Sequence, residues 1–165
     1  MAVKKIIKFP EKILLNKTEP VKNIDDSLKA FIEDMFDTMY FNDGVGLSAN
    51  QVGVPKRIAV MNPSGKKEDA LVLINPDIIK KKGCSKAAEG CLSLPGISSD
   101  VKRSSQIEVK FMDLEGGAKH LKLEGLSARI VQHEVDHLNG FLFVDRINFL
   151  KRKLLLKKMK KAKRI

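Results

Sequence analysis

Residues 132–140 read Gln132-His133-Glu134-Val135-Asp136-His137-Leu138-Asn139-Gly140 and contain two of the three histidines in the chain. In a helix, their four-residue spacing places both imidazoles on one face, one turn apart. Two histidine nitrogens can then bind one metal ion, with Glu134 beside it as a candidate general base. The alternative is a surface helix that happens to carry two histidines. A third ligand elsewhere in the chain decides between the two interpretations.

The residues before this stretch predict that it is helical. Leu126, Ile130 and Val131 recur at helical spacing. Gly140 follows as a residue suited to end the helix, because glycine adopts the left-handed conformation at low cost.

The length and composition indicate an ordinary globular protein. The chain has 165 residues, of which 43% are hydrophobic and 31% charged, so we expect one domain over residues 1–165 with a sizeable core. Lysines interrupt the apolar residues of positions 1–10, which is not typical of a signal peptide. No segment is apolar enough to span a bilayer. We therefore expect a cytoplasmic protein without a membrane partner.

The positive charge is concentrated at the C-terminal end. Residues 146–165 carry ten lysines and arginines and no acid, whereas the rest of the chain carries 21 basic and 20 acidic residues. The pattern predicts a basic helix over about residues 148–163, capped by Asn148. Its apolar positions are Leu150, Leu154, Leu155 and Met159, and the first three are expected to anchor it on the body.

The remaining periodicities predict an α+β fold. Besides the two helices above, we expect a helix from Asp25 or Asp26 to Asn42, strands at 57–61 and 71–74, a hairpin of 107–112 and 118–123, and a buried strand or turn at 141–144. This order favours mostly antiparallel strands around a central metal-binding helix.

Residues 44–55 have neither helical nor strand periodicity. Three glycines and Pro55 in twelve residues indicate a shaped loop. No Lys-Ser/Thr pair follows to make a phosphate-binding loop. By itself, this segment is as readily structural as functional.

A hydrolytic metal site needs a third protein ligand and an open position. One group of metalloproteases takes it from a histidine that would stand at Phe143, and no glutamate follows Glu134 that could serve instead. The best candidate is Cys91, within Glu89-Gly90-Cys91-Leu92-Ser93-Leu94-Pro95-Gly96. A nearby cation or metal would hold its thiol deprotonated. The alternative, a nucleophilic Cys91 with a histidine base, is less favoured because the histidine pair already suits a metal.

The other cysteine and the other histidine are expected to have no role in the site. Two cysteines give no disulfide framework, and Cys84 is predicted to be buried or chemically unused. His120 lies in the predicted hairpin between charged neighbours, so we expect a solvated strand residue.

Three stretches together resemble the motifs of the peptide deformylase family. They are Gly44-Val45-Gly46-Leu47-Ser48-Ala49-Asn50-Gln51, Glu89-Gly90-Cys91-Leu92-Ser93 and residues 132–140. They occur in the family's order and at its spacing, and the similarity covers nearly the whole chain. The basic C-terminus and the lack of a targeting extension resemble the bacterial form. Ser48 departs from the alanine usual in the family, and we expect it to leave activity intact.

The resemblance implies metal-assisted hydrolysis that removes the formyl group from the N-terminal formylmethionine of new polypeptides and releases formate. Cys91, His133 and His137 would bind one divalent ion, usually Fe(II), with zinc, nickel or cobalt as substitutes. Glu134 would act as the general base. Gln51, through its side-chain amide, and Leu92, through its backbone N–H, would stabilise the oxyanion.

The resemblance also implies substrate contacts and partners. Val45, Gly46 and Gly90 would line the substrate backbone, and Leu126 and Ile130 would form the methionine pocket. The expected partners are the formylated nascent peptide and, through the basic tail, the ribosome surface, without sequence-specific nucleic-acid binding. Two alternatives remain: a zinc peptidase with the same helix motif, and a ribosome- or RNA-binding module whose metal is structural. The second would need a fourth protein ligand.

Overall fold

The computed structural model describes residues 2–162 and has the predicted α+β architecture. Its α-helices are α1 (Asp26–Phe41), α2 (Gly125–Leu138) and α3 (Phe149–Ala162). The strands are β1 (Gly46–Ser48), β2 (Ile58–Met61), β3 (Leu71–Lys82), β4 (Ser85–Gly90), β5 (Ser98–Arg103), β6 (Gln106–Met112) and β7 (Ala118–Glu124). Single 3₁₀ turns are η1 (Lys12–Leu15), η2 (Ala49–Val52), η3 (Lys67–Asp69) and η4 (Phe143–Arg146).

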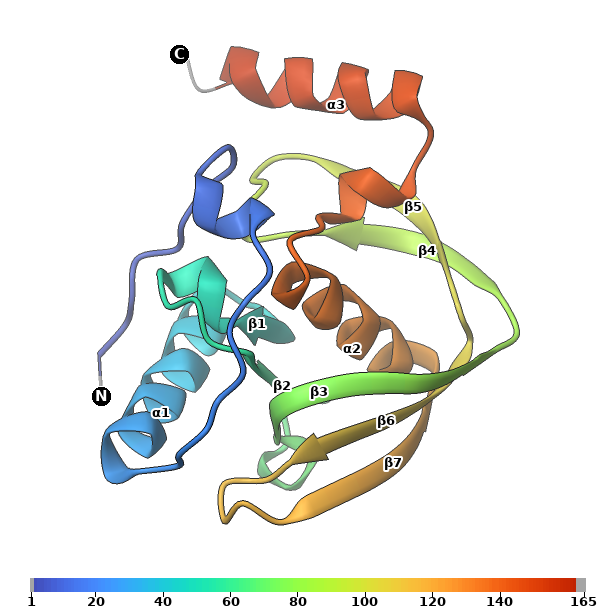
Figure 1. The fold of residues 1–165 in the computed structure, drawn as a ribbon. Helices are drawn as coiled ribbons and strands as arrows, with labels where there is room; N and C mark the ends of the chain where they lie inside the picture. Colours follow the sequence, from blue (N-terminus) through green and yellow to red (C-terminus); the bar gives the residue numbers. More distant parts are fainter. Residues whose placement is uncertain (1, 163–165) are drawn as a thin grey trace.

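Two antiparallel sheets surround α2 (Figure 1). The larger has the order β1-β2-β3-β6-β7, and the smaller consists of β4 and β5. Ala128, Val131 and Leu138 of α2 are fully buried in one apolar cluster with residues of β2, β3 and β6. The helix is thereby fixed between the sheets, which brings its histidines close to the end of β4.

Helix α1 confirms the predicted cap and apolar face. The Asp25 side chain accepts a hydrogen bond from the N–H of Leu28 at 2.8 Å. The inward stripe includes Ile32, Met35 and Met39, all at most 1% exposed. This stripe packs on β1 and β2 and so supports the segment that follows the helix.

The predicted β6–β7 hairpin is confirmed, with Met112 opposite Ala118 at its closed end. Strand β3 is much longer than predicted. The predicted strand covers only residues 71–74, but the strand continues past Asn75 and Pro76 through an irregularity. Asn75 has a φ of 52°, and the register with β6 shifts between Ile74 and Asp77. A bulge of this kind absorbs the proline without ending the strand.

Strands β4 and β5 were not predicted. The β4 sequence Ser85-Lys86-Ala87-Ala88-Glu89-Gly90 has no β-branched or aromatic residue, so it lacks a strand signal. Residues 44–55 also contain more regular structure than predicted, because β1 and η2 lie within them. Of the two alternatives for residues 141–144, the turn is confirmed at Phe143 and Val144, which are buried and begin η4, whereas Phe141 is exposed.

Helix α3 begins near the predicted position, and Asn148 caps it by accepting a hydrogen bond from the N–H of Lys151 at 2.8 Å. Its predicted end at residue 163 lies outside the described residues. The predicted anchors are partly wrong: Leu150 and Leu154 are 72% and 67% exposed, whereas Met159 is 2% exposed. Nine positions separate Leu150 from Met159, which is two and a half turns of a helix with 3.6 residues per turn. The two side chains therefore lie on opposite sides of α3.

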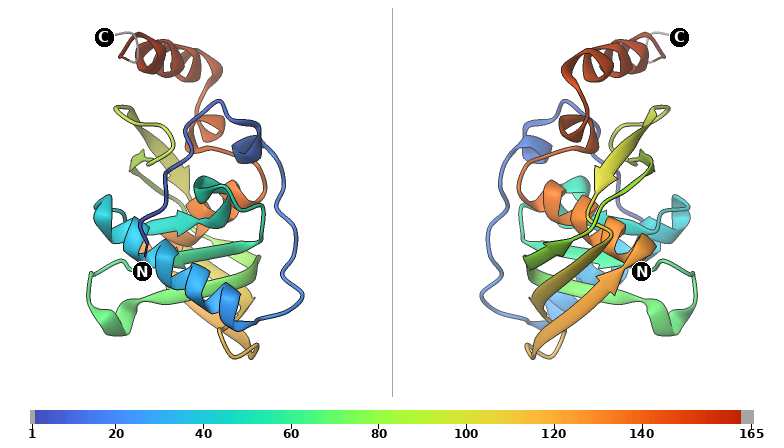
Figure 2. Two further views of the ribbon diagram at one scale, coloured as in Figure 1. Left: turned by 90° about the vertical axis from the view of Figure 1, so that its left-hand side faces the viewer. Right: turned by 90° about the vertical axis from the view of Figure 1, so that its right-hand side faces the viewer.

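The face of α3 that meets the body is formed by Leu155, Leu156 and Met159. Figure 2 shows α3 at one end of the molecule, set apart from the sheets, so its other face is open. Among residues 2–162, no helix has the length and apolar character needed to cross a membrane.

Candidate metal centre

Helix α2 presents both histidines of the motif on one side. The ring centroids of His133 and His137 are 5.0 Å apart. The helix ends at Leu138, and Gly140 follows with a φ of 81°. A Cβ at Gly140 would lie 2.6 Å from the carbonyl oxygen of Leu15, so a side chain does not fit where the chain leaves the helix.

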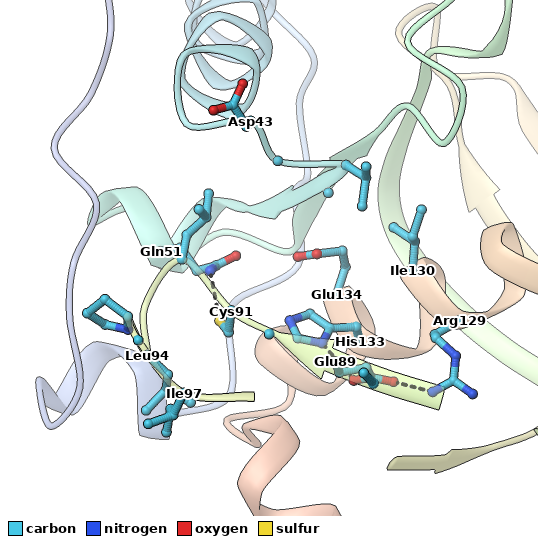
Figure 3. Close-up of a pocket in the computed structure, with 18 of the residues that line it drawn as sticks. Asp43, Gln51, Glu89, Cys91, Leu94, Ile97, Arg129, Ile130, His133 and Glu134 are labelled. Atoms are coloured by element: carbon cyan, nitrogen blue, oxygen red, sulfur yellow. Dashed lines mark hydrogen bonds and ion pairs between the residues drawn. The ribbon is translucent and has the colours of Figure 1, made fainter. Parts of the chain in front are cut away.

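Cys91 directly follows β4 and meets the two histidines. Its Sγ lies 3.2 Å from Nε2 of His137. One donor atom from each of Cys91, His133 and His137 lies within 4.8 Å of the others. The structure thus brings together the three predicted ligands from two distant parts of the chain. Figure 3 shows two of them, Cys91 and His133, at the edge of the pocket.

Glu89, two residues before Cys91, orients His133. Its Oε2 is 3.0 Å from Nδ1 of His133. A carboxylate accepts a hydrogen bond, so this contact places the proton on Nδ1 and leaves Nε2 as the metal-binding nitrogen. Arg103 donates to both carboxylate oxygens at 2.9 and 3.0 Å, and Arg129 donates at 2.7 Å. Buried guanidinium groups therefore balance the charge of Glu89.

Asp136, between the two histidines in sequence, extends this network. It accepts hydrogen bonds from Arg103 and from Nε of Arg146, the latter at 2.9 Å. Asp136 is 7% exposed. The helix that carries the histidines is therefore joined to β5 by a buried ion pair and to η4 by one whose arginine is partly exposed.

The electrostatics of the cluster favour a thiolate. Burial acts to raise the pKa of the Cys91 thiol, but His137 and His133 outweigh burial and hold that pKa well below its ordinary value. Burial likewise acts to lower the pKa of His133, but Cys91 and Glu89 raise it well above the ordinary value. Negative charge on sulfur is the form that binds a metal.

Glu134 lies beside the cluster and is 3% exposed. Burial raises the pKa of its carboxyl group, and the neighbouring His133 and His137 only partly offset this effect. Its Oε2 is buried without a hydrogen-bond partner among the described residues. One carboxylate oxygen is therefore available to a molecule bound in the site.

Gln51, in η2, directs its amide nitrogen toward the same point. Its Nε2 donates to Oγ of Ser93 at 3.2 Å and faces Sγ of Cys91 at 3.5 Å. Its Oε1 is held on the opposite side by Ser48. The loop of residues 44–55, which has no helical or strand periodicity, thus brings an amide donor to the predicted metal ligands.

An open pocket of about 520 Å³ adjoins these groups. The predicted substrate and oxyanion residues all line it: Val45, Gly46, Gln51, Gly90, Leu92, Leu126 and Ile130. Val45 and Leu126 are 44% and 52% exposed, which places them at the rim. A Cβ at Gly46 would lie 2.5 Å from Oε1 of Glu134, so a larger residue at this position would collide with the Glu134 carboxylate.

Several residues of the site were not predicted to be functional. Glu89, Ser93 and Asp136 lie within the motifs quoted above, and Arg103 and Arg129 lie outside them. None has a clear signal in the sequence, because the alternation of exposed and buried residues that puts Arg103 on the buried side of β5 is a property of the folded strand. His120 is an exposed residue of β7, as predicted, and it contacts Glu108. Cys84, predicted to be either buried or chemically unused, is exposed, so burial is wrong and the unused thiol stays a prediction.

The donor set fits a divalent metal. It offers one thiolate and two imidazoles, and in residues 2–162 no fourth histidine, cysteine or carboxylate belongs to the group. An open three-ligand site beside a buried carboxylate defines the class of metal-dependent hydrolases.

Comparison with known proteins identifies the family. The model of the family described as Polypeptide deformylase matches residues 3–153. The chain is 42% identical to a peptide deformylase of Nitrosococcus oceani over 165 residues, which cover 100% of this chain and 99% of that protein. The crystal structure of a peptide deformylase from Legionella pneumophila superposes with a TM-score of 0.94 at 43% identity, covering 99% and 96% of the two chains.

A peptide deformylase from Ehrlichia chaffeensis in complex with actinonin has a TM-score of 0.92 at 39% identity, with full coverage of both chains. The chain belongs to the peptide deformylase family. It is a hydrolase that removes the formyl group from nascent polypeptides.

Proposed function

We propose that deformylation takes place at the Cys91–His133–His137 cluster, with these three side chains binding one divalent ion. The observation that supports this proposal is the approach of their donor atoms to within 4.8 Å at the edge of the pocket. Fe(II) is the proposed ion in the cell, and zinc, nickel or cobalt would bind the same donors. When bound, the ion supplies Lewis acidity, which lowers the pKa of the attacking water and polarises the formyl carbonyl.

Glu134 acts as the general base in this proposal. It takes a proton from the attacking water and delivers it to the nitrogen of the leaving amine. Support comes from its burial beside the ligands and from an Oε2 that has no partner among the described residues. A raised pKa suits this role, because the carboxyl group must both accept and return the proton.

The oxyanion formed on the formyl carbon is stabilised by Gln51 and Leu92. The Nε2 group of Gln51 already faces the cluster, 3.5 Å from Sγ of Cys91. The N–H of Leu92 belongs to the peptide bond that follows Cys91, so it lies near the same point. Donors fixed before the reaction stabilise developing charge without a cost of reorganisation.

The peptide chain of the substrate lies between β1 and β4. Each of these strands has one edge without a strand partner in the described part of the chain, because β1 ends the larger sheet and β4 belongs to a sheet of two. An extended peptide can pair with such an edge through its backbone. Val45, Gly46 and Gly90 are the positions for this pairing, and Leu126 and Ile130 form the methionine pocket.

The basic tail docks the enzyme on the ribosome, in the cytoplasm, where formylated chains emerge. Helix α3 keeps its inner face on the body and exposes Leu150, Leu154 and several lysines. Lysines on an open helix bind RNA phosphates by releasing counterions, without reading base sequence. A structural metal with a purely RNA-binding role is disfavoured, because the three-ligand site opens into a pocket.

The test combines metal analysis of anaerobically purified protein with formate release from a formyl-Met peptide. We expect about one metal ion per chain and formate release that stops when a chelator removes the ion. An unformylated peptide should not be cleaved internally, which separates this activity from that of a zinc peptidase. Undiminished formate release by metal-free protein would contradict the proposal.

A further inference from the structure

Two hydrogen bonds join Ser48 to the Gln51 side chain across the start of one short turn. Ser48 is the N-cap of η2, and Gln51 lies three residues further on. Oε1 of Gln51 accepts from the N–H of Ser48 at 3.0 Å and from its hydroxyl at 2.9 Å. Ser48 is 0% exposed and Gln51 is 2% exposed, so water does not compete for these bonds.

A glutamine side chain that accepts from the N–H of the N-cap residue three positions earlier is one half of a capping box, which normally stabilises the start of a helix. Here the turn is only four residues long, and the outer end of the Gln51 side chain faces the metal centre. The two bonds from Ser48 therefore determine where the Gln51 amide group points. Figure 3 shows that this amide reaches over Cys91 from η2.

We propose that Ser48 is a positioning residue for the reaction, which holds the Gln51 amide with its Nε2 group toward the site of oxyanion formation. This inference rests on the oxyanion role proposed for Gln51. A carboxamide has two orientations of similar shape, with oxygen and nitrogen exchanged. The N–H of Ser48 can only donate, so it selects the orientation in which Oε1 faces Ser48. The hydroxyl adds a second donor that restrains rotation of the side chain.

Opposite Ser48, Oγ of Ser93 accepts from Nε2 of Gln51 at 3.2 Å. The amide is thus held from both sides. Its second N–H is directed at Sγ of Cys91 at 3.5 Å, and so at the metal centre, where the oxyanion would form. Ser48→Ala removes the hydroxyl but keeps the backbone N–H. We therefore expect partial release of the amide, with kcat lowered about three- to tenfold and KM unchanged.

The experiment is a double-mutant cycle of Ser48→Ala and Gln51→Ala in the metal-loaded enzyme, read out as formate release. Gln51→Ala alone should lower kcat about 10²–10³-fold. Ser48→Ala should lower kcat in the Gln51 enzyme and have no further effect in the Gln51→Ala enzyme. Metal content and thermal unfolding are measured for every variant. Ser99→Ala is the matched control, because Ser99 is 5% exposed and its hydroxyl contacts only a backbone carbonyl.

The outcomes separate this inference from the proposed function. An equal loss in both backgrounds would show that Ser48 only supports the local fold, and wild-type kcat in Ser48→Ala would show no role for its hydroxyl. Either result overturns the inference and leaves the oxyanion role of Gln51 standing. Near-normal kcat in Gln51→Ala would overturn that oxyanion role and, with it, the inference.

Discussion

Nδ1 of His133 lies 3.0 Å from Oε2 of Glu89, so a buried hydrogen bond joins the metal-binding helix to the strand that leads to Cys91. Two of the three proposed ligands are therefore positioned by one carboxylate. Arg103 and Arg129 hold that carboxylate in turn. Orientation of this kind contributes to metal affinity as well as to structure.

Glu89→Gln should weaken metal binding about 10–100-fold, because the neutral amide loses its ion pairs and no longer fixes the His133 ring. Competition with a chelator measures the affinity. Glu108→Gln is the matched control, since Glu108 makes a similar 3.0 Å contact with His120 on the surface. Equal affinities for wild type and Glu89→Gln would contradict the positioning role of Glu89.

Arg103→Met should lower the free energy of unfolding by about 3 kcal/mol. The substitution leaves two buried carboxylates, Glu89 and Asp136, short of a partner. The loss falls at the lower end of the usual range because Arg129 and Arg146 still pair with them. Urea unfolding of the metal-loaded protein measures it. Lys86→Met, at a surface ion pair, should cause no measurable change, and a similarly small effect for Arg103→Met would refute the prediction.

Peroxide or air should inactivate Fe(II)-loaded enzyme faster than nickel- or zinc-loaded enzyme. Fe(II) is itself oxidised, and the low pKa of the Cys91 thiol favours the thiolate, which is the form that oxidants attack. The measurement is residual formate release over time for each metal, with mass spectrometry of the Cys91 peptide. Equal lifetimes for all metals would argue against this account.

Removal of residues 160–165 should reduce salt-sensitive binding to ribosomes and largely keep deformylation of small peptides. The deletion takes away four basic residues but keeps Met159, which anchors α3 at 2% exposure. Co-sedimentation at low and high salt measures binding. Replacing Lys80 and Lys82 of β3 by glutamine is the control for nonspecific charge. Unchanged binding after truncation would reject the docking role.

Elements with a clear periodicity were predictable from the sequence. The apolar stripes of α1 and α2 and the alternation of β6 and β7 each report burial against one neighbouring surface. Strands β4 and β5 were missed, because β4 is rich in alanine and charged residues. Leu150 and Leu154 were misassigned because α3 carries leucines around much of its circumference, and only tertiary packing decides which of them turn inward.

The candidate ligands were predictable because His133 and His137 stand four residues apart in a helical pattern and Cys91 is the best remaining candidate for a third ligand. The hydrogen-bonding residues that hold these ligands in place were not predictable. Glu89, Arg103 and Asp136 come from three separate elements, so no fixed spacing in the sequence relates them. Similarly, the hydrogen bonds from Ser48 to the Gln51 side chain depend on η2, a turn that has no hydrophobic period.

Glu134→Gln tests the central claim most directly, because it separates metal binding from chemistry. Glu134 is not among the three proposed ligands, so the variant should keep about one metal ion per chain while kcat falls about 10²–10⁴-fold. Metal content and formate release from a formyl-Met peptide are measured on the same anaerobic sample. Near-normal turnover in the metal-loaded variant would contradict the proposed mechanism.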